Sequence, residues 1–160
     1  MTTPWRLCLF AAVSVSLVAC SSGGPEPGGT AVVGDDPRIV VHDFSVARDM
    51  LLNLRLEYLS EHGCLVVRSI DIETGESAGV SAPIWPSDVE PLNEDGRIGV
   101  TDPEAGELVD GDSFTAGGSY TSASELDEAP DLPEECAPEG EFVTINQGSL
   151  EKGPYEGDSR

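Results

Sequence analysis

The chain has 160 residues, with 30 Asp and Glu against 8 Lys and Arg, which gives a net charge of −22 at pH 7. This charge excludes nucleic acid as a partner, because a protein that binds a phosphate backbone needs basic side chains to displace its counterions. It also excludes direct adsorption on an anionic lipid surface, which would repel the chain. The 18 glycines and 12 prolines predict many turns and few long helices.

The amino-terminal residues 1–19 have the layout of a secretory signal peptide. Residues 1–6 carry Arg6 and no acid, and the run that follows, up to Ala19, is apolar or small. From Leu7 to Cys20 this run has 14 residues, whereas a helix that spans the hydrocarbon core needs about 20. We therefore expect a cleaved export signal rather than a transmembrane helix.

The end of this run, Leu17-Val18-Ala19-Cys20, resembles the lipobox of bacterial lipoproteins. The alternative, ordinary cleavage after Ala19, would place the bulky Leu17 where small residues are preferred. The resemblance implies cleavage before Cys20 and a lipid, with acyl chains such as palmitate, on its thiol. It also implies anchoring on the extracytoplasmic face of the cell membrane. The mature chain would have 160 − 19 = 141 residues and, without Arg6, a charge of 7 − 30 = −23.

The remaining cysteines, Cys64 and Cys136, are predicted to form a disulfide. Cys8 lies in the signal peptide and Cys20 is the expected lipidation site, so an even pair is left in an exported protein. Two free thiols are the alternative. A zinc site is disfavoured because neither cysteine lies in a Cys-x-x-Cys motif or near a pair of histidines.

The mature chain would begin with residues 20–37, which we expect to be the lipidated cysteine followed by a flexible linker. Residues 21–29 of this linker read SSGGPEPGG. A first strand is predicted at 38–44. Residues 46–59 suit a helix by their i+4 spacing, but Leu54, Leu56 and Tyr58 alternate with polar residues. That alternation favours a strand at 53–59, which a turn at 60–63 would join to a strand at 64–70 as a hairpin.

Short extended segments separated by turns continue to the end of the chain. We expect turns at 73–76 and 93–96, a surface loop at 122–138 that Cys136 fixes, and a disordered tail at 151–160. The pair Gly117-Gly118 should end the strand before it. Further extended segments are predicted at 83–86, 97–100, 107–115 (with a turn at 110–112) and 141–146.

This pattern predicts one all-β domain at 38–150, either a small antiparallel barrel similar to an OB-type barrel or a sandwich. The order of 63–67, 84–86, 110–118 and Cys136 with a closing strand resembles small secreted bacterial lipoproteins of unknown function. That resemblance implies a fold and no activity.

Three sequence motifs contain a serine that could be a catalytic nucleophile. Ser77 lies in a Gly-x-Ser-x-Gly sequence, but both histidines precede it, and a nucleophile elbow needs a following helix and a later His. Ser113 follows Gly111-Asp112, as a protease serine would, yet the chain is too short for two barrels. Ser149 and Lys152 match Ser-x-x-Lys without its partner motifs. We expect no catalytic residue among them.

The sequence signals for a metal site are also weak. His42 beside Asp43 and His62 beside Glu61 are expected to be solvated surface pairs. Calcium is a better candidate, but none of the acidic turns supplies an Asp-x-Asp-x-Asp-Gly loop. These turns carry Glu94, Asp95, Asp102, Asp110 and Asp112. We expect no metal and no cofactor.

The remaining aromatic candidate is Trp85, between two prolines. We expect it to pack in the core rather than to stack on a sugar. The sequence therefore predicts a lipid-anchored binding or structural module for an unknown envelope protein or ligand. The alternative is an envelope hydrolase whose active site the sequence does not reveal.

Overall fold

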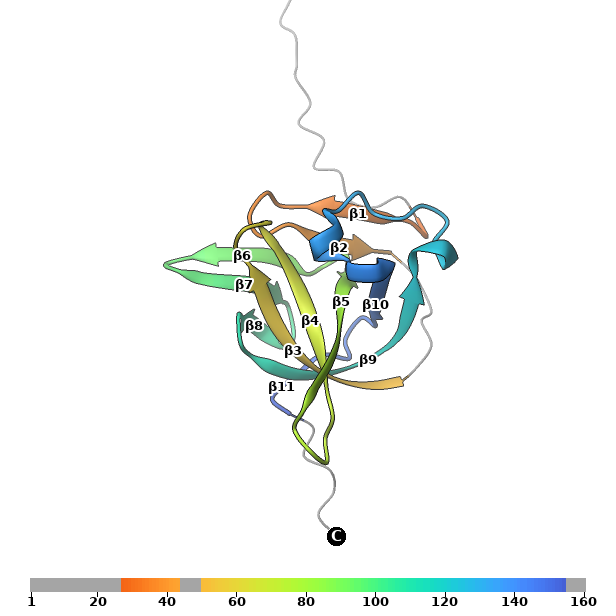
Figure 1. Ribbon diagram of the computed structural model, residues 1–160. Helices are drawn as coiled ribbons and strands as arrows, with labels where there is room; N and C mark the ends of the chain where they lie inside the picture. The colour runs from red at the N-terminus through yellow and green to blue at the C-terminus, as the bar shows by residue number, and fades with distance from the viewer. Residues whose placement is uncertain (1–26, 44–49, 155–160) are drawn as a thin grey trace, which may run out of the picture.

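The computed structural model describes residues 27–43 and 50–154, and these form an all-β domain (Figure 1). The signal peptide and Cys20 lie outside the described residues. The first six strands are β1 (Thr30–Val33), β2 (Ile39–His42), β3 (Met50–Leu59), β4 (Cys64–Ile70), β5 (Ser77–Pro86) and β6 (Glu90–Glu94). The others are β7 (Arg97–Asp102), β8 (Gly106–Val109), β9 (Ser113–Ser122), β10 (Glu141–Ile145) and β11 (Glu151–Lys152).

Five strands, β3, β4, β5, β9 and β10, close into a barrel of the predicted OB-like kind. β3, β4 and β5 form a meander, β9 pairs with β3, and β10 lies between β9 and β5. The predicted small barrel is confirmed, but it is mixed rather than antiparallel throughout, because β10 and β5 are parallel. An odd number of strands in a closed ring cannot alternate in direction throughout, so one pair must be parallel.

A three-stranded sheet, β6-β7-β8, occupies the connection from β5 to β9. Its hairpin turn is Asp95-Gly96, both with positive φ, 52° and 80°, which suits a two-residue turn between twisted strands. The sheet packs on the barrel through Val89, just before β6, and through Val100 and Leu108. The segment thus closes one side of the main core.

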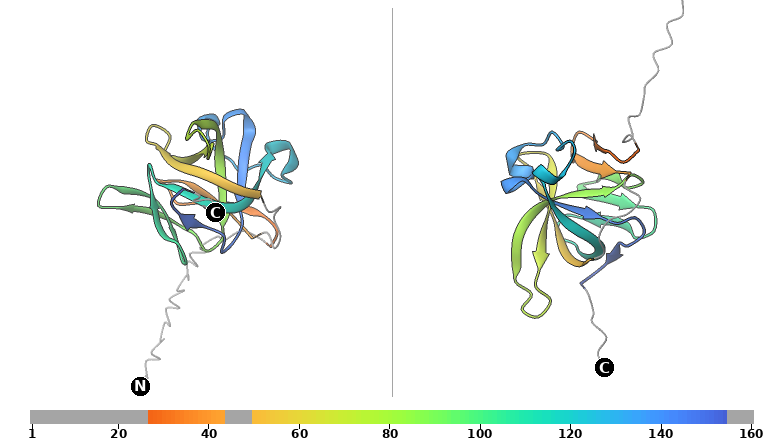
Figure 2. Two further views of the ribbon diagram at one scale, coloured as in Figure 1. Left: turned by 90° about the horizontal axis from the view of Figure 1, so that it is seen from below. Right: turned by 90° about the vertical axis from the view of Figure 1, so that its right-hand side faces the viewer.

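The apolar side chains form two cores, one on each face of the sheet β2-β5-β10. Alternate residues such as Val41, Trp85 and Val143 point into the barrel. Val40, Ile84 and Phe142 point to the other face, where the segment Ala123–Gly140 covers them. That segment contains three short 3-10 turns, Ala123–Glu125, Glu134–Cys136 and Pro138–Gly140, and lies over one side of the molecule (Figure 2).

The disulfide joins Cys64 to Cys136, as the cysteine count predicts. Both residues are buried. Cys64 is the first residue of β4, and Cys136 ends the second 3-10 turn of the covering segment. The bridge therefore fastens the cover of the second core to the barrel.

The predicted β3–β4 hairpin is confirmed, with Leu54 opposite Ser69 and Leu59 opposite Cys64. β3 begins at Met50, and the alternative helix of residues 46–59 is therefore wrong from Met50 onward; residues 44–49 lie outside the described part. The extended segment at 83–86 is only the end of β5, whose first half makes a hairpin with β4 that projects from the barrel (Figures 1 and 2).

Several predicted boundaries need correction. Thr30–Val33 of the expected linker forms β1, because Ala31 and Val33 pack against the main core. Gly117 and Gly118 lie inside β9 rather than at its end: a Cβ on Gly118 would lie 2.1 Å from the carbonyl oxygen of Thr144. The expected tail is ordered at its start, where β11 pairs with β9.

Candidate functional site

An open groove of about 460 Å³ lies between the β1–β2 turn and β6. This volume falls in the range of small-ligand sites. The turn contributes one wall and the whole of β6 the other. The residues that line the groove are Gly34, Asp35, Asp36, Pro37, Glu90, Pro91, Leu92, Asn93, Glu94 and Thr101.

Hydrogen bonds hold the wall made by the β1–β2 turn. The Arg38 amide donates to the carbonyl oxygen of Gly63 at 2.7 Å. The Tyr58 hydroxyl donates to the Asp36 carboxylate, and this bond raises the pKa of Tyr58 above its ordinary value of 10.0. The Asn93 side chain crosses from β6 and donates to the Asp36 carbonyl at 2.8 Å. The two walls are thereby linked directly.

Gly34 allows the two walls to approach each other. Its φ is +76°, a conformation that favours glycine. A Cβ at this position would lie 2.6 Å from the Pro37 carbonyl oxygen and 2.9 Å from Cγ of Pro91. A larger residue would therefore push the turn away from β6 and widen the groove.

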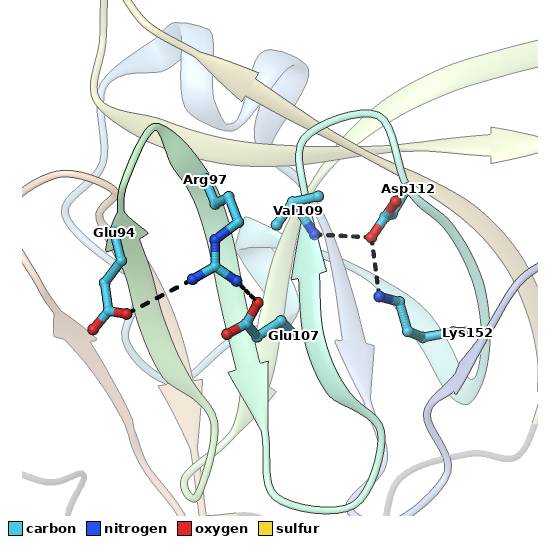
Figure 3. Close-up of polar contacts among 6 residues, drawn as sticks. All are labelled: Glu94, Arg97, Glu107, Val109, Asp112 and Lys152. Atoms are coloured by element: carbon cyan, nitrogen blue, oxygen red, sulfur yellow. Dashed lines mark hydrogen bonds and ion pairs between the residues drawn. The ribbon is translucent and has the colours of Figure 1, made fainter.

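The charge of the groove is negative. Asp35, Asp36, Glu90 and Glu94 are all exposed, and no basic residue is among the residues that line the groove. The neighbouring Arg97 does not line the groove, but it contacts Glu107 and lies 3.8 Å from Glu94, one of the lining residues (Figure 3). The groove can therefore accept a cation or a hydrogen-bond donor.

Other basic side chains in the described part of the chain also contact acids. Lys152 of β11 lies 3.4 Å from Asp112, whose carboxylate also accepts the Val109 amide at 3.1 Å (Figure 3). Arg68 bonds Glu57 across the β3–β4 hairpin. Such exposed pairs stabilise little. Of the four groove carboxylates, only Glu94 has a basic partner among the ion pairs of the described residues, so the groove keeps an acidic excess.

The three serines of the sequence motifs lie at the starts of two strands and in a turn. Ser77 begins β5 opposite Ile70, so it does not lie on a turn from a strand to a helix. Ser113 begins β9 opposite Arg55. The hydroxyl of Ser149 donates to the carbonyl oxygens of Asn146, at 2.7 Å, and of Gly117, at 3.2 Å. This contact shapes the turn between β10 and β11.

His42 is buried at the end of β2, so the expectation of a solvated side chain was wrong. Its Nε2 lies 2.8 Å from the carbonyl oxygen of Ile145. Burial lowers the pKa of His42, and the bond to Ile145 and the charges of Asp43 and Asp88 oppose this shift. His62 instead lies in the β3–β4 turn, with Nδ1 3.7 Å from Glu135. The two histidines therefore have different partners.

The acids considered for calcium act in turns. Asp102 accepts the amides of Glu104 and Ala105 at 2.8 and 2.7 Å, and Asp110 accepts the amide of Tyr58 at 2.9 Å. Asp112 has the contacts described above. Among residues 27–43 and 50–154, no group of three or more His, Cys, Asp or Glu is placed to hold a metal ion.

Trp85 lies in the core, as predicted. It is fully buried, and its ring centroid is 5.9 Å from that of Phe114. Its Nε1 has no hydrogen-bond partner among the described residues. A smaller cavity of about 120 Å³ lies beside Phe114, between the β4–β5 hairpin and Pro154.

The sequence does not predict the groove, because the expected linker at residues 20–37 includes the β1–β2 turn. Four of its ten lining residues come from that turn, and the other six follow more than 50 residues later. The signal that could have revealed it is the β-branched segment Thr30–Val33 between two glycines. Such a segment suits a short strand.

Comparison of the chain with protein-family models, curated proteins and solved structures yields no match. In the described part of the chain, no helix is both long and apolar enough to cross a membrane.

Proposed function

We propose that the chain is an extracytoplasmic lipoprotein, anchored to the cell membrane through lipid on Cys20, and that its barrel is a binding module for a positively charged ligand. The observation that carries the binding role is the acidic groove between the β1–β2 turn and β6. The lipobox at 17–20 supports the anchor.

The shape of the groove supports binding rather than simple solubility. Acidic turns on a protein surface are common and aid solubility. Here, however, four carboxylates from two distant segments surround one concavity. The bonds from Tyr58 and Asn93 to Asp36 hold the turn in place before any ligand arrives. A site held in this way loses little conformational freedom on binding.

The anchor and the charge of the domain fit together. A mature chain of charge −23 is repelled by an anionic lipid surface, so only a covalent lipid would keep it there. Nine residues, 21–29, lie between Cys20 and Thr30. A segment of this length reaches at most about 35 Å when fully extended, so the anchor would keep the barrel near the membrane surface.

Titration with spermine, a linear polyamine, tests the binding role. The double variant Asp35→Asn, Glu90→Gln should bind spermine about three- to tenfold more weakly, because two exposed carboxylates are lost from the groove. The matched control is Glu73→Gln, Glu76→Gln at the tip of the β4–β5 hairpin, which changes the net charge equally outside the groove. It should bind nearly as well as the wild type.

The result that would contradict the binding role is equal weakening in both double variants, since binding would then follow net charge alone. Raising the ionic strength should weaken binding to the wild type, because the groove is open to solvent.

A further inference from the structure

The outer edge of β1 has no paired strand among residues 27–43 and 50–154. β1 is the last strand of its sheet, next to β2. The amide of Asp43 donates to the carbonyl of Gly29, so these residues form a hydrogen-bonded pair. Because such pairs alternate along an antiparallel ladder, Ala31 and Val33 bond to β2, and Thr30 and Val32 point their amides and carbonyls outward. No hydrogen bond involves these outward groups within the described residues.

Apart from the short length of β1, four residues, this edge lacks the features that usually protect an exposed strand. Such edges commonly carry Pro, Lys or a bulge. The edge of β6 shows this protection. Glu94 and Arg97 form the pair next to the two-residue turn, so by the same alternation the backbone of Pro91 faces outward. Proline has no amide hydrogen to offer there. β1 has only Thr, Ala and Val, and the Val32 side chain is 37% exposed.

The acidic groove begins where β1 ends. Gly34, which follows Val33, lines the groove together with Asp35 and Asp36. A strand added along β1 would therefore bring one of its ends to these carboxylates. Their charge favours basic residues at that end of the added strand.

We propose that the outer edge of β1 is a strand-addition site for an extended segment of a partner protein, with basic residues at the end that lies beside Gly34. The inference rests on the proposed binding role and not on the anchor. Main-chain hydrogen bonds to Thr30 and Val32 supply affinity, and the carboxylates of the groove select the charge of the partner. A second copy of this chain is a poorer occupant, because the two strongly acidic molecules repel each other.

The test uses the full chain in detergent and two synthetic peptides of about seven residues, a typical strand length. Each alternates Thr and Val and carries Lys-Arg at one end, the amino end in one and the carboxyl end in the other. Fluorescence anisotropy should detect binding of at least one. The same peptide with methylated backbone amides, or with Glu-Glu in place of Lys-Arg, should bind about tenfold more weakly, as one or two lost hydrogen bonds or charges imply.

Variants of β1 locate the site. Val32→Pro removes an outward amide without removing a bond to β2, and it should weaken peptide binding about three- to tenfold. Val32→Thr keeps the amide and should bind like the wild type. Hydrogen exchange gives a readout that does not depend on variants: the peptide should slow exchange of the Thr30 and Val32 amides, while those of Ala31 and Val33 are already protected.

Three results would overturn the proposal. The first is that neither basic peptide binds, and the second is that one binds without slowing exchange at Thr30 and Val32. The third is a concentration-dependent dimer that Val32→Pro dissociates, which would make a second copy the occupant. Spermine binding that Asp35→Asn, Glu90→Gln weakens, together with no peptide binding, would leave the proposed function standing and reject this inference.

Discussion

The disulfide between Cys64 and Cys136 fastens the cover of the second core to the first residue of β4, across a sequence separation of 72 residues. Without it, the segment Ala123–Gly140 would be held by Ala123, Leu126, Leu132 and Ala137 against the sheet. These side chains are only partly buried. The bridge therefore links a long segment with few buried side chains to β4, which pairs with both β3 and β5.

Removing this bridge should destabilise the domain. The double variant Cys64→Ser, Cys136→Ser should lower the free energy of unfolding by about 4 kcal/mol, because the unfolded chain regains the freedom of a loop of this length. Urea unfolding followed by the fluorescence of Trp85, the only Trp after Cys20, measures the change. Two reactive thiols in the folded wild-type protein without reductant would contradict the bridge.

Gly118 should tolerate no side chain. In Gly118→Ala the new Cβ would lie 2.1 Å from the Thr144 carbonyl oxygen and 2.7 Å from Cδ1 of Leu52, so β9 and β10 must separate. We expect a loss of about 2 kcal/mol or more in the free energy of unfolding. Ser119→Ala at the next position is the control and should change stability little. Equal stability of the two variants would show that β9 and β10 are not packed this closely.

His42 should make the domain less stable in mild acid. Burial lowers its pKa in the folded protein below the value of 6.5 for the unfolded chain, so the unfolded state binds the proton more readily. The stability that neutral His42 contributes is complete above about pH 6.5 and is lost as the pH falls toward the pKa of the folded state.

The variant His42→Gln isolates this effect. The free energy of unfolding should fall more steeply between pH 7.5 and pH 5 in the wild type than in the variant, while titration of the carboxylates is common to both. NMR titration of the His42 ring should give the lowered pKa directly. A difference between wild type and variant that does not change with pH would mean that His42 is not buried in its neutral form.

Asp71 should determine the order of the β4–β5 hairpin tip. Its carboxylate accepts the amides of Glu73 and Thr74, at 2.9 and 2.8 Å, and the Thr74 hydroxyl at 3.1 Å, and these bonds lower its pKa. In Asp71→Ala the amides of Glu73 and Thr74 should exchange with solvent faster, whereas Asp71→Asn should retain part of their protection. Unchanged exchange in Asp71→Ala would contradict this role.

Local sequence patterns predicted the parts of the fold that depend on neighbouring residues. The alternation of Leu54, Leu56 and Tyr58 identified the β3–β4 hairpin, and the apolar character of Trp85 placed it in the core. The pairing of Cys64 with Cys136 followed from the number of cysteines. Each of these depends on a short-range signal or on a simple count.

The parts that were missed depend on contacts between distant segments. The sequence predicts a linker where the structure has β1, because only the pairing of β1 with β2 and its packing on the core distinguish it from a flexible segment. Gly117 and Gly118 were read as a strand end, although Gly118 is needed where β10 crosses β9 closely. The groove also depends on a contact between distant segments, since the β1–β2 turn lies beside β6, which is remote in sequence.

The most direct test of the account is the intact mass of the full-length protein extracted from the membrane of its host with detergent. We predict a chain that begins at Cys20, lacks residues 1–19, and carries the added mass of a diacylglyceryl group, with or without a further acyl chain. Cys20→Ala should move the protein out of the membrane fraction or leave its signal peptide uncleaved. A wild-type mass that retains Ala19, or that shows no acyl chain on Cys20, would contradict the lipid anchor.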